Sequence, residues 1–341
     1  MKKYFFFLSI LIFIAFSSCE RNYDLSGIST LKDKPVVEGY IENGLPPYVF
    51  LTKTFSLFGN LSSSNVGKIY IHNAVVSITG SNGQVINLKE YNVPFGKDTI
   101  SVYTINGLDF SGKAAIKIPF AGLGMVGIDL ATINPTDTGH LNTTYKLNIS
   151  IPAANNLEAA ELTAETKIFG SVKLDSVWCK QRGTIGDDTN YVRIYIRRTD
   201  NGSTRDFYRY FTQVNNKGLL PGYNSSFNDD FTNGKTYDFP ISAGFNKNDT
   251  TSQAFKNFGY FKKGDTVTLK LTAIDNDVYD FWQTADNAYS NVGNPFAAPS
   301  NVKTNIKGGG IGVWCGYASY HPPIYQRYII VKGTSILKHL K

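Results

Sequence analysis

The sequence predicts a mainly β protein, and three features carry this prediction. Short segments rich in β-branched and aromatic residues recur along the chain, for example at 35–41, 48–52 and 190–198. Gly, Asn and Pro turns separate these segments, and Asn82-Gly83 is the strongest short hairpin signal that a sequence offers. Hydrophobic residues make up 42% and charged residues 18% of the chain, which favours a packed protein over a disordered one.

We expect two β-sandwich domains of immunoglobulin-like or transthyretin-like form. The first spans residues 35–168, with strands expected at 35–41, 48–52, 74–79, 84–88, 99–105, 144–151 and 162–168. The second spans 172–341, with strands expected at 175–180, 190–198, 205–214, 266–274 and 328–332. The alternative to a boundary near 169–172 is a single continuous sandwich.

The second domain is also expected to carry one helix near 278–290. Asp277 can cap its N-terminus. Its aromatic face would consist of Tyr279, Phe281, Trp282, Ala285 and Tyr289.

In the segment 190–198, polar and apolar residues alternate, so Val192, Ile194 and Ile196 are expected to face the same side of a strand. The segment 215–260 is rich in Asn, Gly, Ser and Phe and predicts long loops with one or two strands.

The first 18 residues have the pattern of a signal peptide. Lys2 and Lys3 precede an apolar run over 4–16, which is shorter than the roughly 20 residues that a membrane-spanning helix needs. Ser17-Ser18-Cys19 follows and resembles the cleavage site of a bacterial lipoprotein, although Phe16 replaces the usual aliphatic residue. We therefore expect Cys19 to be lipidated and residues 19–34 to form a tether to the membrane; an ordinary signal peptide is the alternative.

The charge distribution argues against a nucleic-acid partner. The formal net charge is +7, and removal of Lys2 and Lys3 with the signal peptide leaves 7 − 2 = +5. Basic residues in the remaining chain are scattered, with adjacent pairs only at 197–198 and 262–263. Binding to nucleic acid requires a clustered basic stripe, which this pattern lacks.

The sequence also lacks the common catalytic signatures, so we expect no enzymatic activity and no cofactor. The four histidines (72, 140, 321 and 339) have no spacing suited to zinc, and no Gly-x-Ser-x-Gly motif occurs. The run Gly308–Gly312 could suggest a phosphate loop, but it leads into an expected strand and no Lys-Ser/Thr pair follows it. A turn or bulge, where two backbones pass close together, is the favoured interpretation.

Acidic clusters at 187–188, 228–230 and 275–277 could supply oxygen ligands to calcium. Asp275 and Asp277 are the best candidates among them. None of the clusters has the twelve-residue loop of an EF-hand. Turn chemistry at strand ends explains Asp and Asn at these positions equally well.

Aromatic side chains in polar or proline-containing segments are candidate contacts for a partner. These are Tyr223, Phe227, Tyr317, Tyr320 and Tyr325. The alternative is that such side chains fill the core and pair across strands, as aromatic residues of β proteins often do.

Cys179 and Cys315 remain once Cys19 is assigned to the lipid. Each follows a Val-Trp pair in an apolar segment. Disulfides form in the oxidising cell envelope, so a bridge between them is predicted if their strands are neighbours. Two separate buried thiols are the alternative.

Several stretches of the chain resemble a known family. In the first half these are Val36-Val37-Glu38-Gly39-Tyr40-Ile41 after Cys19, followed by the segment 51–54. In the second half they are the segments 279–282, 294–296 and 305–314, the last of which contains the glycine run and is the most specific. These are similar to the Bacteroidota lipoproteins catalogued as domain of unknown function 4249, although Trp314-Cys315-Gly316-Tyr317 stands where Phe-Gly-Gly-Tyr is expected.

The resemblance implies an outer-membrane location, proximity of relatives' genes to those of TonB-dependent transporters, and no catalytic residue. The expected function is thus that of a non-catalytic outer-membrane lipoprotein, a binding or accessory partner of such a transporter. The alternatives are a structural or adhesive surface protein and a glycan-binding or glycan-acting protein. Both the periplasmic and the cell-surface side of the outer membrane fit the sequence.

Overall fold

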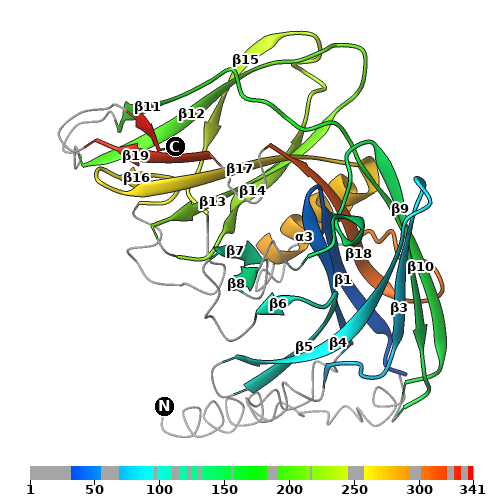
Figure 1. Ribbon diagram of the computed structural model, residues 1–341. Helices are drawn as coiled ribbons and strands as arrows, with labels where there is room; N and C mark the ends of the chain where they lie inside the picture. Colours follow the sequence, from blue (N-terminus) through cyan, green and yellow to red (C-terminus); the bar gives the residue numbers. More distant parts are fainter. Residues whose placement is uncertain are drawn as a thin grey trace, which may run out of the picture.

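The computed structural model is mainly β, as the sequence predicts (Figure 1). The structure describes residues 32–54, 69–95, 98–109, 116–120, 124–128, 133–154, 157–182, 190–215, 217–244, 257–291, 301–320, 326–331 and 337–340. Residues 1–31, which include the expected signal peptide and Cys19, lie outside this range. In the described part of the chain, no helix is both long and apolar enough to cross a membrane.

Most strands belong to one long sheet of 13 strands. Its first half contains β1 (Pro35–Glu42), β2 (Leu45–Lys53), β3 (Val75–Gly80), β4 (Val85–Phe95), β5 (Asp98–Thr104), β9 (Thr143–Ile151) and β10 (Ala160–Ile168). Its second half contains β13 (Phe207–Val214), β14 (Leu220–Asn228), β17 (Thr266–Ile274), β18 (Ile311–Ser319), β19 (Gln326–Ile330) and β20 (Leu337–Leu340). The order along the sheet is β10-β9-β3-β4-β5-β2-β1-β18-β17-β13-β14, with β19 beside β17 and β20 beside β19.

The long sheet crosses the expected boundary near 169–172. β1, from the first expected domain, pairs in parallel with β18, from the second, with Glu38 opposite Val313. The two halves of the chain therefore contribute strands to one shared sheet. The reason is that β18 is the only described neighbour of β1 on the side away from β2, so it satisfies backbone groups that would otherwise form an open edge.

Two smaller sheets complete the fold. One contains β11 (Ser176–Gln181), β12 (Tyr191–Thr199), β15 (Thr236–Ile241) and β16 (Phe261–Lys262), and the other β6 (Leu108–Asp109), β7 (Ile116–Phe120) and β8 (Gly124–Ile128). The expected alternation in β12 is confirmed, because Val192, Ile194 and Ile196 are all buried. They share a core cluster with Tyr208 and Leu269 of the long sheet, so the four-stranded sheet covers this part of the long sheet as a second layer.

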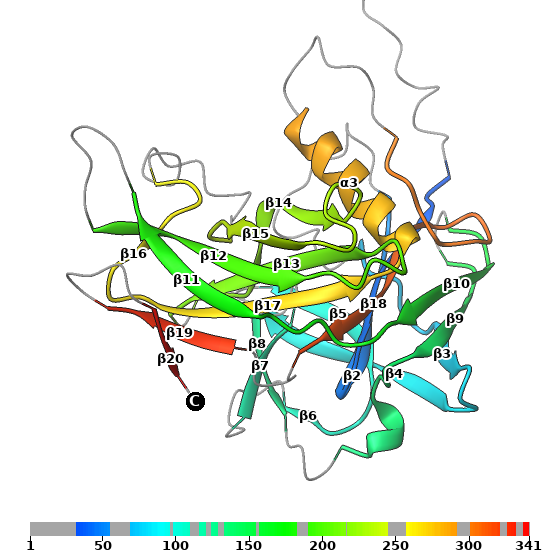
Figure 2. The same ribbon diagram turned by 90° about the horizontal axis from the view of Figure 1, so that it is seen from above.

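The single α-helix of the described residues, α3 (Asn276–Ser290), lies where one was predicted; a short 3-10 turn, η3 (Pro135–Asp137), is also present. The cap is Asp275 rather than Asp277, and its carboxylate accepts a hydrogen bond from the backbone N–H of Val278. Figure 2 shows α3 alongside β14 and β18, with which it is in contact. Tyr279, Phe281 and Trp282 pack between the helix and the sheet, as expected for its aromatic face.

The segment leading into β18 joins the layers. The Trp314 side chain is fully buried, and its indole N–H donates to the Tyr145 carbonyl of β9 at 3.1 Å. The Asn305 side chain bonds both the N–H and the carbonyl of Trp314, each at 2.9 Å. This arrangement fixes β18 beneath β9 and β10.

The glycine run is a site of close backbone approach, as predicted. Gly308 and Gly312 have φ values of 94° and 116°. A Cβ atom would come within 2.1 Å of the Glu161 carbonyl oxygen at Gly308 and within 1.9 Å of the Val37 carbonyl oxygen at Gly312. Backbone carbonyls face these positions, which does not suit a phosphate group.

Candidate functional site

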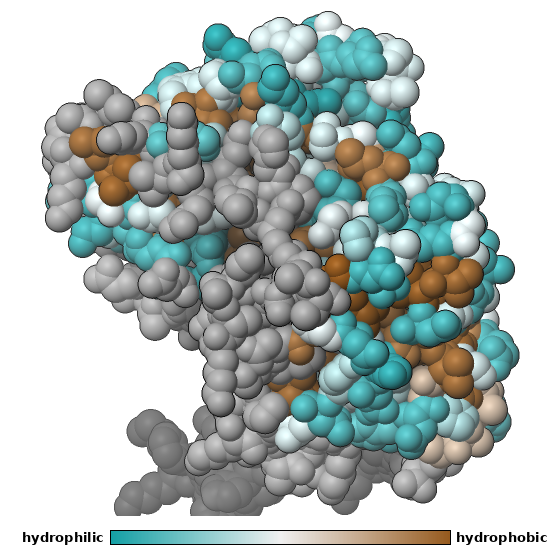
Figure 3. Space-filling view, viewed as in Figure 1, coloured by the Kyte–Doolittle hydropathy of each residue, from teal (hydrophilic) through white to brown (hydrophobic). Residues whose placement is uncertain are grey.

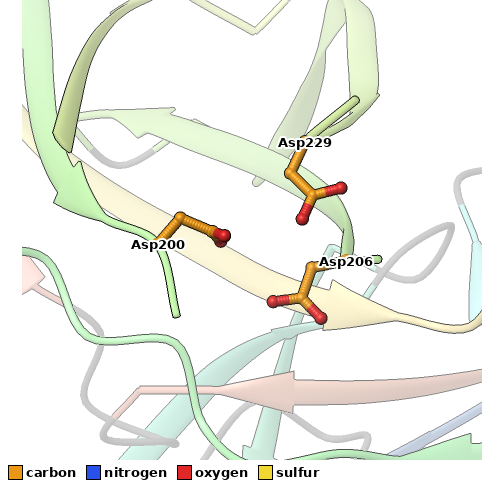
Figure 4. A group of neighbouring side chains, drawn as sticks. All are labelled: Asp200, Asp206 and Asp229. Atoms are coloured by element: carbon orange, nitrogen blue, oxygen red, sulfur yellow. The ribbon is translucent and has the colours of Figure 1, made fainter. Parts of the chain in front are cut away.

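Two connections bring three carboxylates together at one end of the four-stranded sheet. Asp200 directly follows β12, Asp206 directly precedes β13, and Asp229 directly follows β14. One carboxylate oxygen from each lies within 4.8 Å of the others. The three side chains lie close together, and that of Asp200 extends toward the other two (Figure 4). We call these residues the carboxylate cluster.

Two glycines hold the connections in contact. Gly202 and Gly234 have φ values of 72° and 71°, which L side chains rarely adopt. A Cβ atom on Gly202 would lie 2.8 Å from the Gly234 Cα atom. Both glycine N–H groups donate to the same oxygen of Asp200, at 3.0 and 2.9 Å. The backbones of the two connections thus fix the position of the Asp200 carboxylate in the cluster.

Asp229 is the unusual member of the cluster. It is fully buried, and neither of its carboxylate oxygens has a hydrogen-bond partner. Burial raises the pKa of this carboxyl most, and the charges of Asp200 and Asp206 also raise it, while the nearby backbone N–H groups of Asp206 and Asp229 oppose the rise in part. The pKa of Asp200 is lowered although its burial opposes this, because the two glycine N–H groups and Arg198 stabilise its charge.

Arg198 supplies positive charge at the edge of the cluster. Its guanidinium lies 3.1 Å from Asp200 and 3.7 Å from Asp206, and it covers the Tyr208 ring at 4.2 Å. The Tyr208 hydroxyl donates to Asp206 at 2.8 Å. With Arg198 charged and the three carboxylates ionised, the group carries −3 + 1 = −2.

A second polar group is buried between α3 and the long sheet. The Lys270 ammonium contacts the Glu42 carboxylate at 2.5 Å, and both side chains are buried. Arg209, also buried, donates to the Tyr317 hydroxyl at 3.3 Å and lies 3.3 Å from the centre of the Trp282 ring. Burial lowers the pKa of Lys270, and the nearby charge of Arg209 acts in the same direction.

The exposed side of the four-stranded sheet carries an aromatic pair flanked by cations. Trp178 and Tyr195 lie opposite each other on β11 and β12, with ring centroids 5.8 Å apart and planes 16° apart. Lys180 lies over the Tyr195 ring at 4.9 Å, and Arg197 over the Trp178 ring at 5.5 Å. We call Trp178, Lys180, Arg193, Tyr195, Arg197 and Asp238 the outer face.

Hydrophobic residues alone do not single out an interaction surface. Figure 3 shows hydrophobic patches separated by hydrophilic residues on the side of the molecule seen in Figure 1. Phe231, 91% exposed in the β14–β15 connection, is the most exposed large hydrophobic side chain among the described residues. The outer face differs from such isolated side chains because it joins stacked rings to several charges.

The aromatic residues that were expected to contact a partner differ in how far they are exposed. Tyr317 is buried under α3, so the expectation of an exposed contact is wrong there. Phe227 is half-buried and stacks on Phe239 at 4.4 Å. Tyr223 is half-buried and its hydroxyl lies 3.0 Å from that of Ser290. Tyr320 is half-buried, and Tyr325 lies outside the described residues.

The predicted bridge between Cys179 and Cys315 is wrong. Both are thiols and both are buried. Cys179 belongs to the core beneath β11 and β12, whereas Cys315 belongs to the separate cluster beneath α3, so their strands are not neighbours. Burial raises the pKa of Cys179 to about 11 and that of Cys315 to about 12, which leaves both thiols protonated and unreactive at neutral pH.

The favoured calcium candidates have a different role. Asp275 accepts hydrogen bonds from Val278, the Thr166 hydroxyl and the Lys167 N–H, so its carboxylate caps α3 and ties it to β10. Asp277 is exposed in the first helical turn. Residues 187–188 lie outside the described range. Among the described residues of the three clusters, only Asp229, from the cluster at 228–230, belongs to a group of carboxylates that could hold a metal ion.

Sequence reasoning missed Asp200 and Asp206. Both lie in a seven-residue stretch, 200–206, that resembles an ordinary Asn-Gly turn. The available signal was a pair of turns, Asn201-Gly202 and Asn233-Gly234, each with an Asp nearby. Nothing in the sequence indicated that these turns touch.

Taken together, the fold and these groups define a mainly β protein with one long mixed sheet and clustered charges on its connections. Residues 21–321 match the family described as domain of unknown function (DUF4249), and the chain belongs to that family. No curated protein matches the chain.

Proposed function

We propose that the protein is a non-catalytic outer-membrane lipoprotein that binds a TonB-dependent transporter. Its anchor is the lipid on Cys19, after removal of residues 1–18, with 19–34 as the tether. The apolar run at 4–16 followed by Ser17-Ser18-Cys19 supports this assignment. The resemblance to the family supports the choice of partner, because the genes of family members often lie beside those of such transporters.

The outer face is the observation that carries the binding role. Its rings lie parallel and half-exposed, and such aromatic side chains are frequent anchors of protein interfaces. It contains three cations, Lys180, Arg193 and Arg197, and one carboxylate, Asp238, which pairs with Arg197 at 2.7 Å. The excess of positive charge favours a partner surface that carries carboxylates.

The fold proposal accompanies this role. Each half of the chain, 35–168 and 172–341, forms an immunoglobulin-like or transthyretin-like sandwich that contributes strands to the shared long sheet. The packing of the inner side of β12 over β13 and β17 supports this for the second half. A body of this kind presents the outer face on a rigid sheet.

The first experiment tests the anchor. Cys19→Ala removes the thiol that would be acylated, so the protein is expected to lose palmitate labelling and to remain uncleaved at this site or appear in the soluble fraction. Labelling with palmitate and fractionation of membranes measure this. A wild-type protein that incorporates no palmitate, with a variant that still partitions fully with outer membranes, would refute the anchor.

The second experiment separates the proposed partner from the alternatives. Extraction of wild-type protein in mild detergent should retain the transporter through purification. Specific binding on a glycan array without a retained transporter would instead favour glycan recognition by the Trp178–Tyr195 pair, since aromatic rings stack on sugars. If the protein neither retains a transporter nor binds a glycan, the structural or adhesive role remains.

A further inference from the structure

We infer that Asp200, Asp206 and Asp229 form a calcium site that ties the β12–β13 connection to the β14–β15 connection. Nothing in the anchor or partner proposal requires this site. Its basis is the geometry of the cluster together with the unpartnered, fully buried carboxylate of Asp229 (Figure 4).

The spacing fits one cation. Calcium binds oxygen ligands at about 2.3–2.6 Å, so two oxygens on one ion lie no more than about 5 Å apart. The three nearest carboxylate oxygens are within 4.8 Å of one another. The net charge of −2, after Arg198 is counted, matches a divalent ion.

Asp229 is the main reason to place a ligand here. A buried carboxylate whose two oxygens lack hydrogen bonds carries a large desolvation cost unless a charge compensates it. Arg198 contacts Asp200 and Asp206, and no ion pair with Asp229 occurs among the described residues. A cation at the centre of the cluster would be coordinated by an oxygen of Asp229 and would compensate its charge.

The other two carboxylates are positioned to share the ion. The Gly202 and Gly234 N–H groups orient Asp200, and the Tyr208 and Thr204 hydroxyls orient Asp206. A carboxylate oxygen has more than one acceptor position, so these bonds leave room for a metal. The ligand set consists of oxygen atoms on loops, which suits calcium better than magnesium, whose geometry is stricter, or transition metals, which prefer His and Cys.

The test is isothermal titration of calcium chloride into the mature lipoprotein, purified in detergent and stripped with a chelator. Wild-type protein is expected to bind one calcium ion per chain and to bind magnesium more weakly. Asp229→Asn is expected to weaken calcium binding at least about tenfold, because it replaces a charged carboxylate ligand with a neutral amide. Asp206→Asn is expected to act in the same direction.

Asp230→Asn is the matched control. Asp230 is the next residue, but its side chain is exposed and pairs with Arg205 at 2.6 Å instead of entering the cluster. This variant should bind calcium like wild type. The absence of wild-type binding, tighter binding of magnesium, unchanged binding in Asp229→Asn, or an equal loss in Asp230→Asn would each overturn the assignment.

Thermal unfolding gives a second measurement of calcium binding that is independent of the calorimetric titration. Saturating calcium should raise the Tm of the stripped wild-type protein by about 3 °C or more, since a ligand that binds only the folded state stabilises it. In Asp229→Asn the shift should be absent, and without calcium this variant should be at least as stable as wild type. A calcium shift equal in both proteins would contradict the site.

Discussion

Trp314→Ala is expected to lower the free energy of unfolding by about 3–5 kcal/mol, the range for removal of a buried tryptophan from a core. The side chain is completely buried and among the largest in the core. Its ring also fills the space beside Gly39 of β1, where an added Cβ atom would lie 2.7 Å from the ring. The substitution would leave a cavity at the junction of β1, β9 and β18.

Loss of the indole adds to the cost, because the Tyr145 carbonyl would lose its donor in a buried place. Urea unfolding followed by circular dichroism measures the change. Trp178→Ala is the control: its ring lies half-exposed on the outer face, so its free energy of unfolding should change by no more than about 1 kcal/mol. Equal effects of the two substitutions would show that Trp314 does not join the layers as described.

Glu42→Gln is expected to destabilise the protein by about 3–5 kcal/mol, because it leaves a buried ammonium without its paired carboxylate. Lys270 lies 2.5 Å from Glu42, and the positive charge of Arg209 lies close enough to lower its pKa further. The amide replaces the shape of the carboxylate but not its charge. Two cations would then remain in the same buried cluster.

Comparison with a double variant separates charge from packing. Glu42→Gln/Lys270→Met removes the buried ammonium as well and keeps much of its volume, so it should recover a large part of the lost stability. Chemical unfolding of wild type, both single variants and the double variant gives the four free energies of unfolding that a double-mutant cycle needs. A Glu42→Gln variant that unfolds within about 1 kcal/mol of wild type would contradict a charge-paired role.

Local patterns predicted the elements well because local chemistry determines them. Alternation in 190–198 identified the buried side of β12, and an aromatic stripe after an Asp-rich turn identified α3. The cap moved from Asp277 to Asp275 because Asp275 also bonds Thr166 and Lys167 of β10, a contact that no local pattern contains. The glycine run was interpreted correctly since close approach demands glycine whatever the partner backbone.

Long-range pairing was the main feature that the sequence did not reveal. β1 and β18 come from opposite ends of the chain, and parallel pairing leaves no turn signal between them. The bridge between Cys179 and Cys315 was predicted only if their strands were neighbours, and these strands lie in different sheets. Tyr317 was expected on the surface because prolines follow it, but α3 covers it.

The carboxylate cluster and the outer face were likewise predicted only where the local sequence carried a signal. Asp229 lay in an acidic cluster that was identified as a potential set of calcium ligands, whereas Asp200 and Asp206 had only turn-like surroundings. The outer face was also missed, because Trp178 and Tyr195 come from two strands whose register the sequence does not state. Sites of this kind arise where strands meet, so they become visible only with the sheet.

We propose that this protein binds a TonB-dependent transporter through its outer face. The most direct measurement is quantitative mass spectrometry of outer-membrane proteins that co-purify with the lipoprotein after mild detergent extraction. Wild type should retain the transporter, and Trp178→Ala/Tyr195→Ala should reduce its recovery by about tenfold or more, as expected for loss of anchor residues. Phe231→Ala, which changes an exposed side chain outside this face, should leave recovery unchanged. Failure of wild type to retain a transporter, or equal recovery with the outer-face variant, would contradict the account.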